Sequence, residues 1–268
     1  MKAFLFDLSV CNGCYCCQVA CKDEHVANDW MPYTKPQPDY GQFWIKIDEK
    51  VRGTVPKVKV SYTPTMCTHC SDAKCMTVCK ANAIYRREDG MIIIDPAKCT
   101  GCKLCPDACP SQSIYFSDDL NIAQKCTGCS HLIDDGWKEP RCVDACPTDA
   151  LRYGEESEMK ELLADAAPLD NGCGEGRVFY KNVPGKFVAG TVYDPVEKEV
   201  VIGATCTLKD ADGAIHKVET DNFGDFWFND LPGGHSYSLE IRKDAAAKSI
   251  PKISTVDDTN LGDIPMRL

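Results

Sequence analysis

The sequence lacks any hydrophobic stretch that could cross a membrane. No purely apolar run is longer than four residues, the length of the run at 91–94, whereas a membrane-spanning helix needs about 20. The opening residues, MKAFLFDLSVC, reach polar positions before an apolar core of signal-peptide length has formed. We therefore expect a soluble cytoplasmic chain with no membrane insertion. The alternative is a periplasmic location, reached by export of the folded chain with a partner that carries a twin-arginine signal.

Positive charge is also in short supply. The chain has 30 Lys and Arg residues against 40 Asp and Glu residues, which gives a net charge of -10. Nucleic-acid binding requires a basic surface that neutralises phosphates, so this function is excluded. The sequence contains no Ser/His/Asp arrangement, paired carboxylates or glycine-rich phosphate loop. We therefore expect no catalytic site on this chain itself.

Cysteine is the residue that the sequence has in excess, with 19 among 268 residues. Proteins that are dense in disulfides are typically short and secreted, and neither description fits this chain. Of the cysteines, 17 lie between residues 11 and 146, and only Cys173 and Cys206 follow. This step in composition predicts a cysteine-rich domain at 1–155, a linker at 156–184 and a second domain at 185–268.

Sixteen of these cysteines form four quartets that each end in C-x3-C. The quartets are Cys11, Cys14, Cys17 and Cys21; Cys67, Cys70, Cys75 and Cys79; Cys99, Cys102, Cys105 and Cys109; and Cys126, Cys129, Cys142 and Cys146. An aliphatic residue follows each quartet after five positions, at Val26, Ile84, Ile114 and Leu151. Asp7 and Asp95 each stand four positions before a quartet. These features predict four copies of one unit, in which a strand, a cysteine loop, a turn and a second strand follow one another.

The first and third quartets have the spacing C-x2-C-x2-C-x3-C, which is typical of 4Fe-4S clusters in two-cluster ferredoxins. Three thiolates on one tight loop can reach three iron corners of a cubane, whereas the fourth is carried away and binds the neighbouring cluster. Zinc is the alternative, but a zinc site uses two separated pairs and has no need of a third and fourth cysteine at these spacings. Cys16 is left over, because choosing it in place of Cys17 would break the repeated spacing.

The four ordered quartets closely resemble the iron-sulfur subunits of the dimethyl sulfoxide reductase family of molybdopterin enzymes, over roughly residues 1–155. In that family the first and fourth quartets share two clusters, and the second and third share two more. The resemblance implies one site formed by Cys11, Cys14, Cys17 and Cys146, and a neighbouring site formed by Cys126, Cys129, Cys142 and Cys21. It implies a third site formed by Cys67, Cys70, Cys75 and Cys109, and a fourth formed by Cys99, Cys102, Cys105 and Cys79.

The same resemblance implies the fold and the partners. The fold would be α+β, a duplicated two-cluster ferredoxin-like domain with four 4Fe-4S clusters. The chain would form a heterodimer with a large molybdopterin catalytic subunit in an anaerobic oxidoreductase complex, and a further electron donor or acceptor protein could join it. Lys74, Lys98 and Lys125 stand beside ligand positions, where they could raise reduction potentials or simply be solvated.

The insert at residues 22–66 separates the first two quartets. It combines a strand-like alternation, FWIKID, with a loop rich in proline and aromatic residues, and we interpret it as packing surface for the partner subunit. His69 lies between Cys67 and Cys70, where an imidazole could bind a metal. A complete quartet leaves it no vacancy, so we expect His69 to donate a hydrogen bond to sulfur or to the partner instead. The same interpretation applies to His25 and His131.

The last part of the chain has short alternating segments, such as FVAGTVYD, FWFNDL and YSLEIRK, separated by turn signals at 212–213 and 233–234. This pattern predicts an all-β sandwich or small barrel. Gly224, Phe226, Phe228 and Tyr237 resemble the core motif of carboxypeptidase-regulatory-like and Cna-B-like modules. We interpret Cys173 and Cys206 as unpaired thiols, one in the linker and one on a strand.

A four-cluster domain followed by such a β module resembles the small subunits of pyrogallol-phloroglucinol transhydroxylases, and KDEHVANDW and AQKCTGCSHLIDD share the look of that group. The resemblance implies electron transfer for a phenolic substrate, in a transhydroxylase or a reductive dehydroxylase. The complete quartets favour net electron transfer over a redox-neutral reaction. Two alternatives remain: the same relay in a respiratory oxyanion or sulfur-compound reductase, and a zinc-binding structural or interaction protein.

Overall fold

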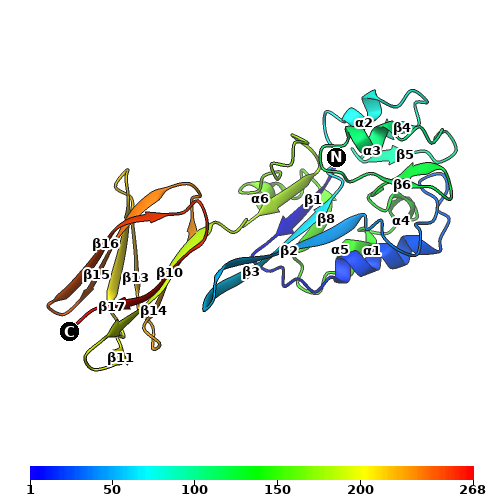
Figure 1. Ribbon diagram of the computed structural model, residues 1–268. Helices are drawn as coiled ribbons and strands as arrows, with labels where there is room; N and C mark the ends of the chain where they lie inside the picture. The colour runs from blue at the N-terminus through cyan, green and yellow to red at the C-terminus, as the bar shows by residue number, and fades with distance from the viewer. The chain divides into compact units, whose positions relative to one another are not determined.

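The structure is a computed structural model that describes residues 1–268. It divides into two units (Figure 1). The first unit comprises Met1–Glu49 and Tyr62–Val183, and the second comprises Lys50–Ser61 and Pro184–Leu268. All the quartet cysteines therefore belong to the first unit. None of the helices combines the length and the apolar character that crossing a bilayer requires.

The first unit is organised around a three-stranded sheet in which β1 (Lys2–Asp7) is the central strand. β8 (Leu151–Glu155) pairs antiparallel with β1, and β9 (Val178–Lys181) pairs parallel with it. Two hairpins complete the strands of this unit, β4 (Ile84–Arg86) with β5 (Ile92–Ile94) and β6 (Tyr115–Ser117) with β7 (Ile122–Gln124). The central strand is buried, since Phe4 and Phe6 have at most 1% of their surface exposed.

Six short helices accompany these strands, and five of them lie in or next to the cysteine quartets. They are α1 (Cys16–Val26), α2 (Lys74–Thr77), α3 (Leu104–Ala108), α4 (Ser130–Asp134), α5 (Arg141–Asp144) and α6 (Lys160–Leu163). α1 packs on α5, and α2 packs on α3 (Figure 1). The first quartet is thereby joined to the fourth, and the second to the third.

The predicted strand at Val26 is wrong, because Val26 is the last residue of α1. The other three aliphatic positions behave as expected: Ile84 and Leu151 begin β4 and β8, and Ile114 directly precedes β6. Proline follows the last cysteine of the third and fourth quartets, but Lys22 follows Cys21. Lysine can continue a helix where proline would stop it, so the first copy of the repeat ends in a longer helix.

The insert forms a hairpin of β2 (Ile45–Thr54) and β3 (Lys57–Met66). Ile45 and Ile47 are buried and alternate with exposed residues, as FWIKID predicted. Residues 50–61, at the turn of the hairpin, belong to the second unit.

The second unit consists of two sheets, as expected for a β-sandwich. Its strands are β10 (Lys186–Asp194), β11 (Glu199–Val200), β12 (Thr205–Asp210), β13 (Ile215–Glu219), β14 (Asp225–Leu231), β15 (Ser236–Lys243), β16 (Ala246–Ser254) and β17 (Thr259–Pro265). One sheet has the order β11-β10-β14, with β17 also pairing β10, and the other has the order β13-β12-β15-β16. Phe226, Phe228 and Tyr237 lie in the buried core between them.

Residues 50–61 are held within the second unit by charged contacts. The Arg52 guanidinium donates two hydrogen bonds to the Asp258 carboxylate, at 2.9 and 2.6 Å, and Lys59 donates to the Asn229 side chain at 2.6 Å. The Arg52 and Asp258 side chains are only 9% and 7% exposed. The sandwich therefore has a ninth segment that the sequence places more than a hundred residues upstream.

Residues 156–184, which the sequence predicted to be a linker, contain α6 and β9. Because β9 pairs with β1, this segment is part of the sheet of the first unit. It also contains Cys173, which is buried.

Candidate iron-sulfur sites

Each quartet begins on a loop with the same backbone turn. The residue directly before the second cysteine has a positive φ in all four loops, namely Gly13 (68°), His69 (48°), Gly101 (70°) and Gly128 (64°). In the first and third loops the residue after that cysteine is also left-handed, with a φ of 62° at Tyr15 and 60° at Lys103. Left-handed residues curl the chain tightly, and glycine adopts this conformation at no steric cost. The four loops are thus copies of one structure.

Two aspartates fix the start of these loops, which explains their repetition in the sequence. Asp7 accepts a hydrogen bond from the Ser9 N–H at 3.0 Å, and Asp95 accepts one from the Ala97 N–H at 2.9 Å. An aspartate that binds the backbone two residues on forms an Asx turn. Each turn ends a buried strand and directs the chain into its cysteine loop.

Two of the sites combine cysteines of the first and fourth quartets. Cys11, Cys14, Cys17 and Cys146 line one pocket, together with Phe6, Ile47 and Leu151. Cys21, Cys126, Cys129 and Cys142 line a second pocket, together with Phe4, His25 and Trp44. In each set, three cysteines come from one quartet and the fourth from the other, which is the crossed arrangement that the family resemblance implies.

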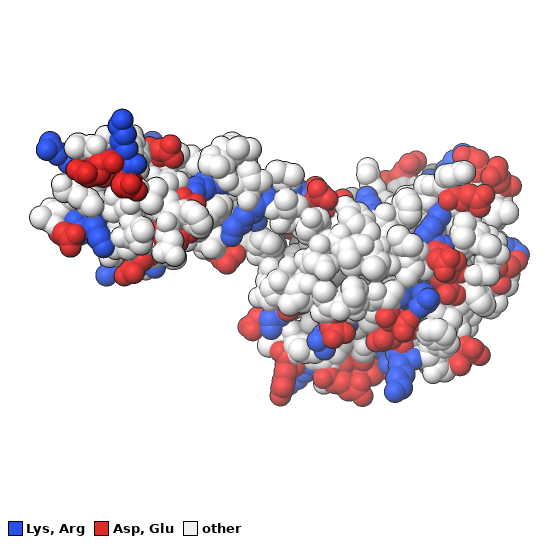
Figure 2. All heavy atoms as spheres, turned by 90° about the horizontal axis from the view of Figure 1, so that it is seen from below, with Lys and Arg blue, Asp and Glu red and all other residues white.

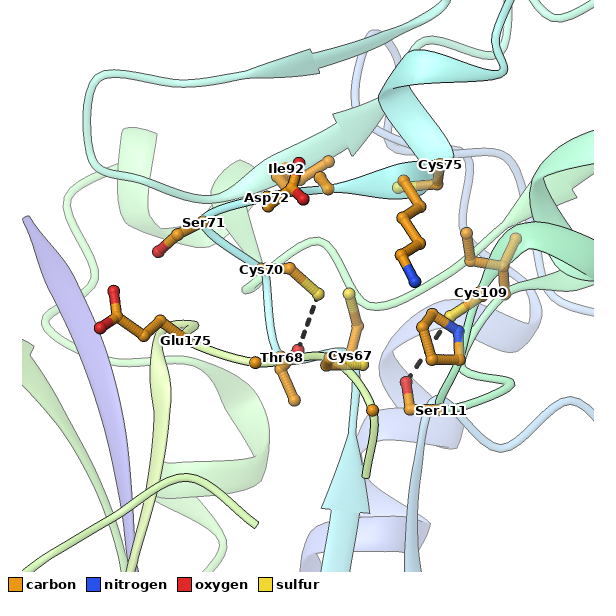
Figure 3. Close-up of a pocket in the computed structure, with 17 residues that line it drawn as sticks. Cys67, Thr68, Cys70, Ser71, Asp72, Cys75, Ile92, Cys109, Ser111 and Glu175 are labelled. Atoms are coloured by element: carbon orange, nitrogen blue, oxygen red, sulfur yellow. Dashed lines mark hydrogen bonds between the residues drawn. The ribbon is translucent and has the colours of Figure 1, made fainter. Parts of the chain in front are cut away.

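A third pocket combines the second and third quartets. Cys67, Cys70, Cys75 and Cys109 line a cavity of about 350 Å³. Figure 3 shows that these side chains come from different segments and surround a common space. A fifth cysteine, Cys173, also lines this cavity. Nothing in the sequence indicated this contact, because Cys173 lies outside the repeat and 64 residues beyond Cys109.

The remaining cysteines gather in the apolar cluster beside the third pocket. Cys79, Cys99 and Cys105 belong to this cluster, with Ile84, Ile92 and Ile114. Burial raises the pKa of the Cys105 thiol to about 12, and Cys99 and Cys79 add to the shift, so the three thiols are close together. Cys102 lies on the same loop and is exposed.

Neighbouring sites are close enough for their thiols to influence one another. Burial raises the pKa of Cys126 to about 11, and Cys67 of the third pocket contributes. Cys75 of the third pocket likewise adds to the shift at Cys105, and Cys17 of the first pocket adds to that at Cys142. The four groups of cysteines therefore form a continuous series: first, second, third, fourth.

Two family models match parts of the sequence. Residues 58–156 match the 4Fe-4S dicluster domain, and residues 188–266 match the carboxypeptidase regulatory-like domain. The pyrogallol hydroxytransferase small subunit of Pelobacter acidigallici is 35% identical over 270 residues, which cover 96% of this chain and 95% of that protein. The protein belongs to the iron-sulfur subunits of the dimethyl sulfoxide reductase family.

Other members of the family match a smaller part of this chain. An anaerobic dimethyl sulfoxide reductase subunit of Escherichia coli (strain K12) is 34% identical, and the match covers 62% of this chain and 80% of that subunit. The arsenate respiratory reductase iron-sulfur subunit of Shewanella sp. (strain ANA-3) is 30% identical, and the match covers 66% and 94%. The expected dicluster fold and regulatory-like module are confirmed, and so is the role as an electron-transfer subunit of a molybdopterin oxidoreductase.

The residues of this iron-sulfur subunit fit the clusters that its family binds. No three His, Cys, Asp or Glu side chains converge on a single-ion site, whereas the corners of a cubane lie apart and require thiolates from several directions. Burial raises the pKa of Cys17 to about 12 and that of Cys75 to about 11. A bound metal ion deprotonates such thiols outright, so loading these sites would release protons.

The three lysines beside ligand positions differ in their surroundings. Lys125 is only 2% exposed, and its ammonium group donates hydrogen bonds to the carbonyl oxygens of Ile92 and of Cys126, the latter at 2.9 Å. Lys98 is 62% exposed and pairs with Asp95 at 3.0 Å, and Lys74 is exposed. Lys125 is therefore the buried cation of this region, beside the second and third pockets.

The histidines are buried side chains that hydrogen-bond within the protein. His69 Nδ1 accepts a hydrogen bond from the Ile92 N–H at 2.9 Å, so its neutral ring carries the proton on Nε2. His25 Nδ1 lies 2.8 Å from the Cys21 carbonyl oxygen, and His131 Nε2 lies 3.1 Å from the Glu24 carboxylate. Burial lowers the pKa of His25 and of His131 to about 4, which keeps both rings neutral at neutral pH.

Proposed function

We propose that this chain carries electrons through four 4Fe-4S clusters to or from a molybdopterin catalytic subunit that acts on a phenolic substrate. The observation that carries the proposal is the crossed grouping of cysteines from paired quartets around common pockets. Each cluster, when bound, supplies a one-electron carrier whose potential the protein adjusts through hydrogen bonds, charge and burial.

Sixteen cysteines would hold the four clusters, in the sets that line the pockets. The first site would use Cys11, Cys14, Cys17 and Cys146, and the second Cys21, Cys126, Cys129 and Cys142. The third would use Cys67, Cys70, Cys75 and Cys109, and the fourth Cys79, Cys99, Cys102 and Cys105. The proximity of the Cys79, Cys99 and Cys105 thiols supports the fourth set.

The exposure of the cysteines supports a route with an entrance and an exit. Cys14 of the first site and Cys102 of the fourth are exposed, whereas all four cysteines of the second site are buried. Electron exchange with another protein requires a carrier near the surface. The first and fourth sites would therefore exchange electrons with partners, and the second and third would connect them.

The surface of the first unit offers room for a partner. Figure 2 shows a broad area without charged side chains on this unit, bordered by acidic side chains. Protein interfaces are depleted of charge at their centre and polar at their rim. Members of this family pair with a large molybdopterin subunit, and we propose the same pairing here.

The phenolic substrate is supported by the extent of the match. Similarity to the pyrogallol hydroxytransferase small subunit spans 96% of the chain, and so includes the β-sandwich, whereas the match to the dimethyl sulfoxide reductase subunit covers 62%. The reaction would be a transhydroxylation or a reductive dehydroxylation. The presence of all sixteen cysteines favours the reductive reaction, because a redox-neutral reaction has no need of a complete route.

A respiratory reductase for an oxyanion or a sulfur compound is the second candidate, since the dimethyl sulfoxide and arsenate reductase subunits are also similar. The test is to purify the chain anaerobically with its co-expressed large subunit, reduce the complex, and follow reoxidation of the cluster absorption. Rapid reoxidation by a polyhydroxylated phenol is expected. Reoxidation by arsenate or a sulfoxide, and not by any phenol, would refute the phenolic assignment and favour the second candidate.

A further inference from the structure

The third pocket contains one thiol more than a cubane can use. Cys67, Cys70, Cys75 and Cys109 are the four cysteines of the proposed site, and Cys173 lines the same cavity. Cys173 is 7% exposed, so it is sequestered with them rather than left at the surface. The inference drawn from this fifth thiol rests on the proposed function, because it concerns the ligands of the third cluster.

The segment that carries Cys173 is bound to the loop of Cys67 and Cys70. The Arg177 N–H donates to the Thr68 carbonyl oxygen at 2.7 Å, and the Ser71 N–H donates to the Glu175 carbonyl oxygen at 2.8 Å. These two hydrogen bonds enclose Cys70 on one side and Cys173 on the other. The two thiols are therefore brought together by backbone structure and not by the chance orientation of flexible side chains.

A second contact fixes this segment against the third quartet. Gly172 has a φ of 75°, and a Cβ built on it would lie 3.2 Å from the Pro110 ring. The Cys173 N–H donates to the Asn171 side-chain oxygen at 3.1 Å, so the turn is ordered by its own hydrogen bond. Cys173 is thereby held between the loop of Cys70 and the residue that follows Cys109.

Cys70 is the ligand nearest to Cys173. Burial raises the pKa of the Cys70 thiol to about 12, the Thr68 hydroxyl opposes the shift, and the Cys173 thiol adds to it through charge and a side-chain hydrogen bond. The Thr68 Oγ1 lies 3.1 Å from the Cys70 Sγ. Among the five thiols of this pocket, Cys70 and Cys173 thus form a close pair.

We propose that Cys173 is a reserve ligand for the iron corner that Cys70 holds. When the iron–sulfur bond to Cys70 breaks, Cys173 forms the replacement bond, and its thiol proton passes to the Cys70 sulfur. One bond is formed and one is broken, the proton is conserved, and no electron is transferred. The exchange keeps the cluster at four irons when a ligand is lost, and Cys173 itself takes no part in electron transfer while Cys70 is bound.

Alanine substitutions test this proposal in the full chain purified anaerobically with its large subunit, because alanine cannot bind iron. Cys70→Ala is expected to retain the iron and sulfide content of the wild type. Cys75→Ala, which has no reserve thiol, is the matched control and should lose iron from the third site. The double variant Cys70→Ala/Cys173→Ala should lose iron as Cys75→Ala does. EPR of the oxidised protein provides a second readout, because a three-iron cluster is paramagnetic in that state and a four-iron cluster is not.

The outcomes separate this proposal from the proposed function. If Cys70→Ala loses as much iron as Cys75→Ala, or if the double variant matches Cys70→Ala, Cys173 is not a reserve ligand although the cluster assignment stands. If Cys75→Ala leaves the iron content unchanged, the cluster assignment itself fails.

Should Cys70→Ala not fold, the rate of iron release to a chelator from Cys173→Ala serves instead. It should be several-fold faster than from the wild type or from Cys206→Ala, a buried cysteine in the β-sandwich. Equal rates in all three proteins would overturn the proposal.

Discussion

Replacing the buried Lys125 with methionine should lower the reduction potential of the clusters in the second and third sites. A reduced cluster carries one more negative charge than an oxidised one, and a nearby cation stabilises that charge. Lys125 is 2% exposed, and its Nζ lies 2.9 Å from the carbonyl oxygen of Cys126, a proposed ligand of the second site. Methionine keeps the length of the side chain and removes the charge.

The structure indicates the size of the effect. A unit charge about 10 Å from a cluster, in a medium of effective dielectric constant about 20, contributes roughly 1.7 kcal/mol. For a one-electron couple this free energy corresponds to roughly 70 mV, since a tenfold change in the equilibrium constant is about 59 mV. Removal of the two hydrogen bonds to carbonyl oxygens costs stability, so the iron content of the variant must be measured alongside the potential.

The assay is a potentiometric titration followed by EPR, carried out on the wild type, Lys125→Met and Lys98→Met. Lys98 is the matched control, because it also precedes a quartet cysteine but is 62% exposed and paired with Asp95. Water screens an exposed charge, so Lys98→Met should leave the potentials nearly unchanged. A shift in Lys125→Met that is no larger than that in Lys98→Met, with full iron content in both, would refute the electrostatic reasoning.

Three further predictions concern other parts of the protein. Cys16→Ser should leave the iron content intact and Cys17→Ser should lose or convert a cluster; the reverse result would mean that the register of the first quartet is wrong. Because burial lowers the pKa of His25 to about 4, the unfolded state binds its proton more readily, and folding stability should fall by about 3 kcal/mol as the pH drops from about 6.5 to 4; urea unfolding of His25→Gln should lack this component, and an unchanged pH dependence would contradict it. Arg52→Ala leaves the buried Asp258 unpaired and should cost about 3 kcal/mol, measured by hydrogen exchange of the β10 amides; the double variant Arg52→Ala/Asp258→Ala should recover part of the loss, and no recovery would mean that the pair is not the cause.

The local repeat could be predicted from the sequence because it depends on neighbouring residues. Aspartate and glycine at fixed distances from the cysteines set the Asx turns and the left-handed residues of the loops, and both can be recognised in the amino-acid order. The alternation in FWIKID likewise predicted β2, since a strand with one buried face has a period of two. The assignment of each cysteine to a cluster came from the family resemblance and stays a proposal.

The contacts that the sequence could not predict are those between distant segments. β9 pairs with β1 across more than 170 residues, and this pairing brings the segment of Cys173 into the first unit. Gly233 and Gly234 were interpreted as a hairpin turn, but they join β14 to β15, which belong to different sheets. A turn signal states that the chain reverses and does not state which strand it meets next.

The most direct test of the central claim is the iron and acid-labile sulfide content of the anaerobically purified chain with its large subunit, after correction for iron bound elsewhere in the complex. Four 4Fe-4S clusters require about sixteen iron and about sixteen sulfide ions per chain. This account predicts both values, together with the absence of zinc. Zinc in place of iron and sulfide, or iron and sulfide for fewer than four clusters, would contradict it.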